Sequence, residues 1–480
     1  MNRVNFLDPI FKPKSIAIIG ASTRVEKWGH RMVARPLNTG YRGAIYPVNP
    51  NVKEVAGLKS FATIADLPQD VDLAVITVPS PRVPEALREC LQHGIRGVVI
   101  ISAGFAEAGP EGKKLQEEVG RIASEANIPL VGPNCMGLWS DPVSLNLAFE
   151  ESPIRGSIAF ISQSGTLGNY LMLLAKAKGY GFSAFVSSGN QAMLEVVDYL
   201  EYFARDEGTR VVILYIEGMQ DTNRFFRVAK EVVKKKPIVV YKAGRFEVGV
   251  RAALSHTASL AGNDQIFEGL CKQIGLIRCY DPLHTCDMAV ALGSQPLPKS
   301  NRVAILSGGG GYCVTMAEAS VAWGLDVPQL DPTASEKIKK ILPPFAPQPW
   351  NPIDAAADIR PMTYARALDI LMSLDYIDGI LMMIPFMFSF QLRSPASVRE
   401  LMDATEVICA LPKKYNKPII GNMIPQISVG PALDLFHKAG IPFYATQDES
   451  ARAMHALVRY AQFLQRALLR MRAEQSSGSL

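Results

Sequence analysis

The stretch "GSIAFISQSGTLGNYLMLLAKAKG", residues 156–179, carries the pattern that best indicates the fold of this chain. An apolar run ends at Ser162, a small polar turn follows, and an amphipathic helical pattern begins at once. This order predicts a strand, a turn and a helix, the unit from which parallel α/β sheets are built. The stretch "RVAILSGGGGYCVTMAEASVAWG", residues 302–324, repeats the same order. We interpret the two stretches as copies of one βα design.

Further strand-like runs extend this pattern in both directions, separated by helical or mixed segments. They lie at 15–20, 44–49, 73–79, 97–104, 128–137, 181–190, 210–218, 236–244, 379–386, 417–425 and 441–446. Such alternation predicts an α/β fold, with parallel sheets that carry helices on both faces and bind ligands at the carboxyl ends of their strands. We expect three domains, at residues 1–150, 151–297 and 298–465, and a disordered tail over 466–480.

The composition is that of a globular protein with a large core. The 480 residues are 48% hydrophobic and 20% charged, a profile that needs no disulfide or metal for stability. The formal net charge is +5 and the basic residues are mostly scattered. We therefore expect an anionic small-molecule substrate and no nucleic acid. The one tight basic run, Lys234–Lys236, is predicted to close a helix, where cations are favourable.

The cysteines and the N-terminus indicate a cytoplasmic protein. Seven cysteines, an odd number without a CxxC pair, favour a reducing compartment and argue against a metal site of the zinc type. The N-terminal residues do not have the layout of a signal peptide. The longest apolar run, 379–390, is too short for a bilayer and contains Pro385, so we expect no membrane association.

The polar turn within 156–179 is the most specific candidate site. Its residues are small or uncharged: Ser162, Gln163, Ser164, Gly165 and Thr166. Free amide groups at a helix N-terminus bind phosphate or an oxyanion, so we predict a phosphate site here. The alternative is an ordinary helix cap, for which serine and threonine are also preferred.

Two other turns have a similar pattern. "IIGASTRVEKWGH", residues 18–30, offers amide groups and two hydroxyls at a predicted helix start, which favours a nucleotide over the alternative of a purely structural turn. The glycine spacing of dinucleotide-binding folds is absent, and Asn49 stands where a ribose-binding acid is expected, so a nicotinamide-dependent oxidoreductase is disfavoured. The glycine-rich turn at 307–311 allows close backbone approach, and we favour packing over ligand binding there.

His256 lies in "RAALSHTASLAG", residues 251–262, among small and hydroxylated residues. One interpretation is a hydrogen-bonding loop residue without chemistry. The other is a ring that needs room to be approached or to move, because neutral imidazole is a good nucleophile near pH 7.

Three motifs together resemble the α subunit of ADP-forming acyl-CoA synthetases (acetate–CoA ligases), relatives of succinyl-CoA synthetase. They are "GPNCMG" (132–137), "ISQSGTLGN" (161–169) and "SHTASLAG" (255–262), in this order and spacing. The resemblance covers essentially the whole chain and implies a Rossmann-like CoA-binding domain followed by two flavodoxin-like domains. It also implies a ligase that reversibly converts acyl-CoA, phosphate and ADP to a carboxylic acid, CoA and ATP through an acyl phosphate.

The same resemblance implies roles for individual residues. His256 matches the phosphoryl carrier, Glu217 matches the carboxylate that orients its ring, and 162–166 matches the phosphate loop. Positions that match the CoA site are Gly20, Ala21, Ser22, Thr23, Asn49, Pro50, Asn51, Pro79, Ser80, Ser102, Ala103 and Asn134. Ser102 and Ala103 depart from the Thr-Glu pair of succinyl-CoA synthetase. We interpret Cys135 as a buried small residue rather than a nucleophile.

The family's ATP-grasp module has no counterpart in this sequence. The resemblance therefore implies a separate ATP-grasp β subunit that binds ADP or ATP with Mg²⁺, in an α2β2 assembly. The alternative is a non-catalytic CoA-binding or scaffold protein of the same architecture.

Overall fold

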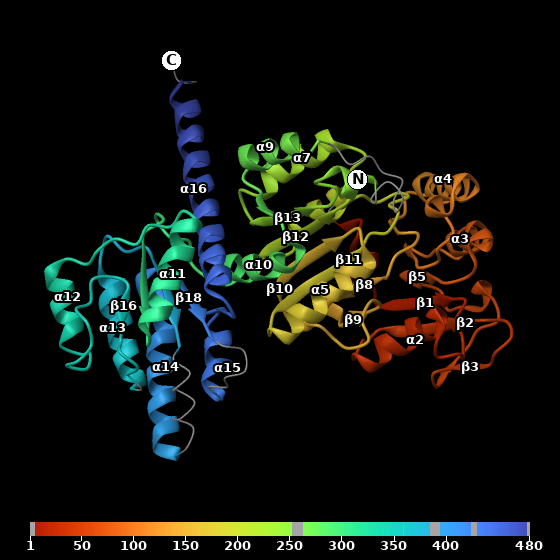
Figure 1. The fold of residues 1–480 in the computed structure, drawn as a ribbon. Coiled ribbons are helices and arrows are strands. Elements are labelled where there is room, and N and C mark those ends of the chain that lie inside the picture. Colours follow the sequence, from red (N-terminus) through yellow and green to blue (C-terminus); the bar gives the residue numbers. More distant parts are fainter. Residues whose placement is uncertain (1–4, 252–262, 359, 385–393, 424–429, 478–480) are drawn as a thin grey trace. The chain divides into compact units, whose positions relative to one another are not determined.

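A computed structural model describes residues 5–251, 263–358, 360–384, 394–423 and 430–477, and it confirms the predicted α/β class (Figure 1). The chain forms two compact units, Met1–Cys286 and Asp287–Leu480. The first unit contains two large sheets and the second contains one. No described helix is long and apolar enough to cross a bilayer.

The first sheet is fully parallel, in the order β2-β1-β5-β6-β7. Its strands are β1 (Ser15–Ile19), β2 (Ala44–Val48), β5 (Leu73–Ile76), β6 (Gly97–Ile100) and β7 (Leu130–Val131). The strand order reverses at β1. Because parallel crossovers are right-handed, α2 (Trp28–Asn38) covers one face, and α3 (Val83–Gln92) and α4 (Pro110–Glu125) cover the other (Figure 1). The carboxyl ends of β1 and β5 therefore border a crevice.

The second sheet has the order β14-β13-β12-β10-β11-β8-β9. Its parallel strands are β10 (Ile154–Ser162), β11 (Gly181–Ser187), β12 (Val211–Ile216), β13 (Ile238–Lys242) and β14 (Ile277–Cys279). Its helices are α5 (Gly165–Ala177), α6 (Val196–Phe203), α7 (Thr222–Val232) and α9 (Asp264–Ile274). The order again reverses at the first strand of the unit, so β10 and β12 border the crevice of this sheet.

The edge of the second sheet contains two strands from the region assigned to the first domain. β8 (Leu138–Ser140) pairs antiparallel with β11, and β9 (Leu145–Asn146) pairs antiparallel with β8. The expected division at residues 150 and 151 thus falls after these strands in sequence. They nevertheless complete the second sheet, so the "GPNCMG" motif leads directly from one sheet into the other.

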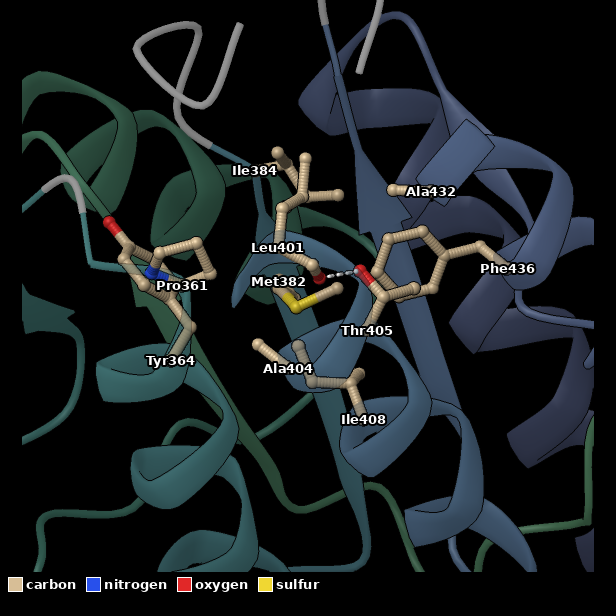
Figure 2. A pocket seen from close by; sticks show the side chains of 10 residues that line it. All are labelled: Pro361, Tyr364, Met382, Ile384, Leu401, Ala404, Thr405, Ile408, Ala432 and Phe436. Carbon is tan, nitrogen blue, oxygen red and sulfur yellow. Dashed lines mark hydrogen bonds between the residues drawn. The ribbon is translucent and has the colours of Figure 1, made fainter. Parts of the chain in front are cut away.

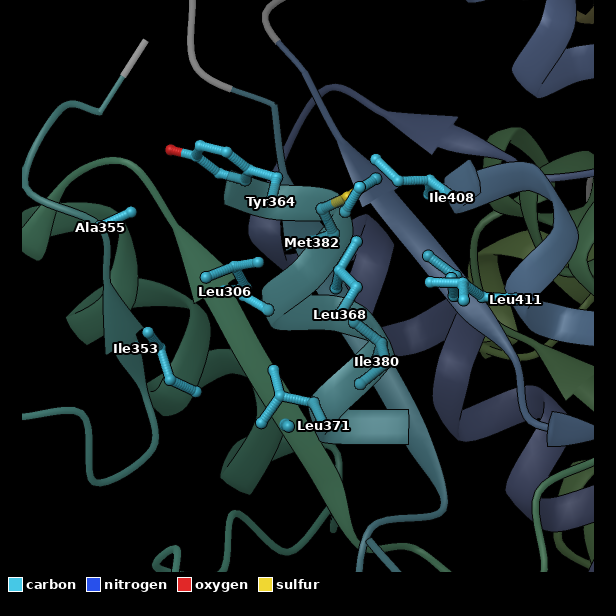
Figure 3. Packing of buried hydrophobic residues seen from close by; sticks show 14 of the residues in the cluster. Leu306, Ile353, Ala355, Tyr364, Leu368, Leu371, Ile380, Met382, Ile408 and Leu411 are labelled. Atoms are coloured by element: carbon cyan, nitrogen blue, oxygen red, sulfur yellow. The ribbon is translucent and has the colours of Figure 1, made fainter. Parts of the chain in front are cut away.

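The second unit contains a parallel sheet in the order β16-β15-β17-β18-β19. Its strands are β15 (Val303–Ser307), β16 (Ile353–Asp354), β17 (Gly379–Met383), β18 (Ile419–Asn422) and β19 (Phe443–Tyr444). Its helices are α10 (Thr285–Ser294), α11 (Gly310–Ala322), α12 (Pro332–Lys339), α13 (Pro361–Ser373), α14 (Pro395–Tyr415), α15 (Pro431–Lys438) and α16 (Gln447–Ser477). Branched and aromatic side chains from β15, β17, α13 and α14 interlock in its core (Figure 3).

The two βα stretches at residues 156–179 and 302–324 have the predicted form. β10 leads through a polar turn into α5, and β15 leads through the glycine-rich turn into α11. Two local expectations differ. The segment expected to be a disordered tail is helical as far as Ser477, because α16 continues through it. The basic run lies beyond the end of α7 rather than inside it, and Lys236 donates hydrogen bonds to the carbonyls of Phe203 and Asp206.

Candidate functional site

The turn between β10 and α5 combines a helix cap with free amide groups. The Ser164 hydroxyl oxygen caps α5 by accepting a hydrogen bond from the amide of Leu167 at 3.3 Å. Within the described part of the chain, the amides of Ser164, Gly165 and Thr166 have no acceptor. The cap and the predicted anion site are therefore compatible, since the cap uses a later amide of the helix.

Gln163 has a role that the sequence did not reveal. Its buried side chain reaches the end of β12, where Oε1 accepts hydrogen bonds from the amides of Glu217 and Gly218, the latter at 3.0 Å. Its Nε2 donates to the carbonyl of Gly218 at 2.6 Å. Gln163 thus joins the polar turn to the residue predicted as the orienting carboxylate, and its side-chain amide is already hydrogen-bonded there.

Close packing accounts for the glycine of this turn. A Cβ atom at Gly165 would lie 2.2 Å from Met136 Cγ and 2.9 Å from Ser187 Oγ. Ser187 Oγ in turn accepts a hydrogen bond from the amide of Met136 at 3.0 Å. The "GPNCMG" and "ISQSGTLGN" motifs, which are separate in sequence, therefore meet at one place.

Glu217 lies directly after β12 and is only 5% exposed. Burial, together with the charge of Glu217, raises the pKa of Tyr215, which stacks on Tyr241 with ring centroids 5.4 Å apart. On the neighbouring strand, burial lowers the pKa of Lys242, which is paired in register with Ile216. The carboxyl edge of β12 and β13 is thus a region of low polarity, where a carboxylate interacts strongly with any charge brought to it.

The predicted carrier His256 lies outside the described residues. The segment that contains it follows Arg251 and precedes Asn263, which caps α9 through its side chain.

The first sheet has a cavity of about 800 Å³ at its crevice. This volume is within the range of sites that hold a whole small-molecule ligand. The lining includes the predicted residues Gly20, Asn49, Pro50, Asn51 and Pro79. It also includes residues that the sequence analysis missed, notably Thr63, Arg82, Glu85, Glu89, Gln92 and His93. Hydrophobic periodicity could have separated the charged face of α3 from its buried face, but it could not have revealed the groove that this helix borders.

Several of the predicted CoA residues form hydrogen bonds with one another around the turn after β1. The amides of Gly20 and Ala21 both donate to the carbonyl of Val48, so they are not free for a phosphate. Asn49 Nδ2 donates to the carbonyl of Ala21 at 2.6 Å, and its Oδ1 accepts from the amide of Asn51 at 2.8 Å. These bonds brace the turn after β1. Among the described residues of this turn, Ser22 and Thr23 are the ones whose amides have no acceptor. Neither of them lines the cavity.

The remaining predicted CoA residues, Ser80, Ser102, Ala103 and Asn134, also lie outside the lining of that cavity. Asn134 has φ +57° and donates from Nδ2 to Asn190 Oδ1 at 3.3 Å. Asn190 donates to Glu107 Oε2 and to Gln116 Oε1. This network connects the loop after β6 in the first sheet with the loop after β11 in the second.

Glu107 is the charged member of this network. Burial alone would raise its pKa, but hydrogen bonds from Asn190 and from the amides of Gly104 and Phe105 lower the pKa overall. The carboxylate is therefore ionised at neutral pH and holds the junction of the two sheets.

Cys135 is 5% exposed, and its thiol donates to the carbonyl of Ile100 at 3.3 Å. Burial raises its pKa to about 12. The thiolate that a nucleophile requires is thus scarce near pH 7, which supports the interpretation of a buried small residue. All seven cysteines lie among the described residues and are free thiols.

In the third sheet, the glycine-rich turn between β15 and α11 is crowded at one glycine and open at the next. A Cβ atom at Gly310 would lie 3.0 Å from the carboxylate of Asp354, whereas one at Gly311 would meet nothing. An apolar cavity between α13, α14 and β17 is lined by residues such as Tyr364, Leu401 and Phe436 (Figure 2). It has room for about 10 Å³, which is the lower limit for one water molecule.

Comparison with known proteins gives three matching family models. Residues 14–140 match the CoA binding domain, 155–292 the succinyl-CoA ligase like flavodoxin domain, and 303–467 the ligase-CoA domain.

Similar proteins extend over nearly the whole chain. The α subunit of acetate–CoA ligase [ADP-forming] II from Pyrococcus furiosus is 39% identical over 456 residues, which are 95% of this chain and 98% of that protein. The acetate–CoA ligase [ADP-forming] of Methanocaldococcus jannaschii is 37% identical over 94% of this chain, which spans 62% of that longer protein. A solved structure of the dinucleotide forming acetyl-coenzyme A synthetase 1 of Ca. Korarchaeum cryptofilum, in complex with phosphate and ADP, is 33% identical. Its TM-score is 0.84, over 97% of this chain and 99% of that chain.

With a relative of this identity matched over nearly its full length, and three family models in the same order, the chain belongs to the family of ADP-forming acetate–CoA ligase α subunits, which are acid–thiol ligases.

Proposed function

We propose that this chain handles acyl-CoA and phosphate for an NDP-forming acyl-CoA synthetase and carries the phosphoryl group on His256. The observation that supports the proposal best is the junction of β10 and β12. There Gln163 joins the amide-bearing turn of Ser164, Gly165 and Thr166 to Glu217. An anion site beside a buried carboxylate is the arrangement that phosphorylation of an imidazole needs.

In the first step an oxygen of phosphate attacks the thioester carbonyl carbon of acyl-CoA. The C–S bond breaks, CoA leaves as a thiolate that takes up a proton, and an acyl phosphate forms. The amides of Ser164, Gly165 and Thr166 stabilise the phosphate oxygens without a mobile cation, with the exposed hydroxyl of Thr166 in the same turn. The hydroxyl of Ser162 is buried and donates to the carbonyl of Ser164 at 2.6 Å, so it supports the turn.

In the second step a ring nitrogen of neutral His256 attacks the phosphorus of the acyl phosphate. The bond from phosphorus to the acyl oxygen breaks and the carboxylic acid leaves as its anion. Glu217 accepts a hydrogen bond from the other ring nitrogen, so it orients the ring and stabilises the positive charge that develops on it.

In the third step a β-phosphate oxygen of ADP attacks the phosphohistidine, the N–P bond breaks and ATP forms. We assign the ADP and Mg²⁺ site to an ATP-grasp β subunit in an α2β2 assembly. The longer relative of Methanocaldococcus jannaschii supports this assignment, because more than a third of its length has no match in this chain.

The decisive experiment is phosphoryl labelling. The chain is co-purified with its ATP-grasp partner and incubated with Mg-ATP labelled at the γ-phosphate, and the peptides are mapped under alkaline conditions. We expect an acid-labile label on the peptide of His256, absent in His256→Asn and formed more slowly in Glu217→Gln. If the partner is folded and bound but no label appears, the non-catalytic CoA-binding alternative takes first place.

A further inference from the structure

The groove of the first sheet has an uneven distribution of charge. Four titratable side chains line it, Arg82, Glu85, Glu89 and His93, and all come from α3 or its two flanking residues. They recur at helical spacing on a face of α3 that borders its buried face, and the buried residue Ala86 lines the groove as well. The helix therefore presents one cation at its start and two carboxylates further along.

Arg82 is available for a ligand. It is exposed, it caps the N-terminus of α3 through its backbone, and among the described residues its guanidinium has no ion-pair or hydrogen-bond partner. His93 differs, because its Nε2 donates to the carbonyl of Pro68 at 2.9 Å. Among the described residues that line this cavity, Arg82 is the only lysine or arginine. A bound anion would therefore meet its positive charge at Arg82.

The ligand of this groove under the proposed function is CoA, whose nucleotide end carries a 3′-phosphate and a diphosphate. The two amides at the crevice, those of Gly20 and Ala21, already donate to Val48. Glu85 in the first turn of α3 and Glu89 one turn further along repel phosphate groups. A phosphate of CoA is therefore best accommodated at Arg82, where a guanidinium forms paired, charge-assisted hydrogen bonds.

We propose that Arg82 binds a phosphate group of the CoA nucleotide, and that Glu85 and Glu89 confine the phosphates to its end of the groove. This inference rests on the proposed use of CoA and adds a binding residue that the motifs do not contain. The glutamates face the uncharged part of the nucleotide, whose hydroxyl and amino groups are hydrogen-bond donors to carboxylates.

The test is calorimetric titration of the full-length chain with CoA and with dephospho-CoA, which lacks the 3′-phosphate. We expect Arg82→Gln to weaken CoA binding by about 10- to 100-fold, the usual range for a hydrogen-bonded charge pair. A loss confined to CoA identifies the 3′-phosphate, and an equal loss for both ligands identifies the diphosphate. The Arg82 side chain is exposed and has no ion pair or hydrogen bond among the described residues, so Arg82→Gln should fold normally.

The matched control is Arg88→Gln, on the same helix. Arg88 pairs with Glu118 at 2.5 Å and does not line the groove, so its replacement should leave both affinities unchanged. Unchanged binding of both ligands in Arg82→Gln, or equal losses in the two variants, would overturn the inference. Failure of the wild-type chain to bind CoA at all is a different result and refutes the proposed function itself.

Discussion

Replacement of Gln163 by methionine tests whether this side chain holds the junction of β10 and β12. Methionine has nearly the same shape but cannot hydrogen-bond in the same way. The change removes the acceptor for the amides of Glu217 and Gly218 and the donor to the carbonyl of Gly218. Three buried backbone groups then lose their partners.

The magnitude follows from these three groups. At about 1 kcal/mol each, the low end of the cost of an unsatisfied buried group, local opening becomes easier by about 3 kcal/mol. Since 1.4 kcal/mol is a factor of ten, amide exchange at Glu217 and Gly218 should accelerate by about 150-fold. The measurement is hydrogen–deuterium exchange on the peptide that contains the end of β12, in the full-length chain.

Thr166→Ala is the matched control from the same turn. The Thr166 side chain is exposed and has no hydrogen-bond partner among the described residues, so exchange at Glu217 and Gly218 should not change. Both variants should slow phosphorylation of His256, Gln163→Met through position and Thr166→Ala through phosphate binding. Wild-type exchange at Glu217 and Gly218 in Gln163→Met would refute the assigned role of Gln163.

Three further predictions concern glycine, pH and thiol reactivity. Gly20→Ala should lower the Tm and weaken CoA binding, because Gly20 has φ +92° and a Cβ would lie 2.9 Å from Val78 Cγ1. The control is Gly57→Ala, at φ +81° with no atom within 4 Å, which isolates the backbone cost of roughly 1–2 kcal/mol. An equal loss of Tm in the two variants would contradict the role of the close contact at Gly20. Burial would raise the folded-state pKa of Glu107, but its hydrogen bonds outweigh burial and lower that pKa. The contribution of Glu107 to the free energy of unfolding is therefore present above the unfolded pKa of about 4.3, and it disappears as pH falls through the lower folded pKa. In urea unfolding, Glu107→Gln should therefore have a lower free energy of unfolding than the wild-type chain at pH 7, and the difference should shrink in acid. A difference that does not depend on pH would rule out a stabilising role of the ionised carboxylate. Burial raises the pKa of Cys135 to about 12, so iodoacetamide at pH 8 should alkylate the half-buried Cys409 before Cys135. The Cys135→Ala variant should keep the activity of the wild-type chain. Loss of activity in parallel with alkylation of Cys135 would instead indicate that Cys135 is a nucleophile.

Much of the fold follows from local pattern. The apolar runs that end in small or polar residues became the parallel strands β1, β10, β12 and β15, because a buried strand needs a continuous apolar run and a turn needs polar or glycine residues. The two βα copies were recognisable for the same reason. The polar turn after β10 was also predictable, since its residues are consecutive in the sequence.

The partners of these residues could not be predicted, because they come from distant segments. Gln163 matches a phosphate loop by sequence, yet its side chain bonds the backbone of Glu217 and Gly218, 54 and 55 residues away. Likewise the turn after β1 contains the right residues for a nucleotide, but the carbonyl of Val48 occupies two of its amides. Whether a polar side chain near a candidate site can bind a ligand depends on the protein groups that lie within hydrogen-bond distance of it. Those groups come from distant segments, so the sequence does not reveal them.

Hydrophobic periodicity and turn chemistry act between near neighbours, so the α/β class, the strand-turn-helix units and the residue types at each turn can be read from the sequence. Three features are visible only in the folded chain: β8 and β9 join the second sheet, Gln163 bonds the backbone of Glu217, and Arg82 lines the groove. Strand order, register and the meeting of two loops depend on contacts between segments far apart in the chain, and no local pattern specifies them.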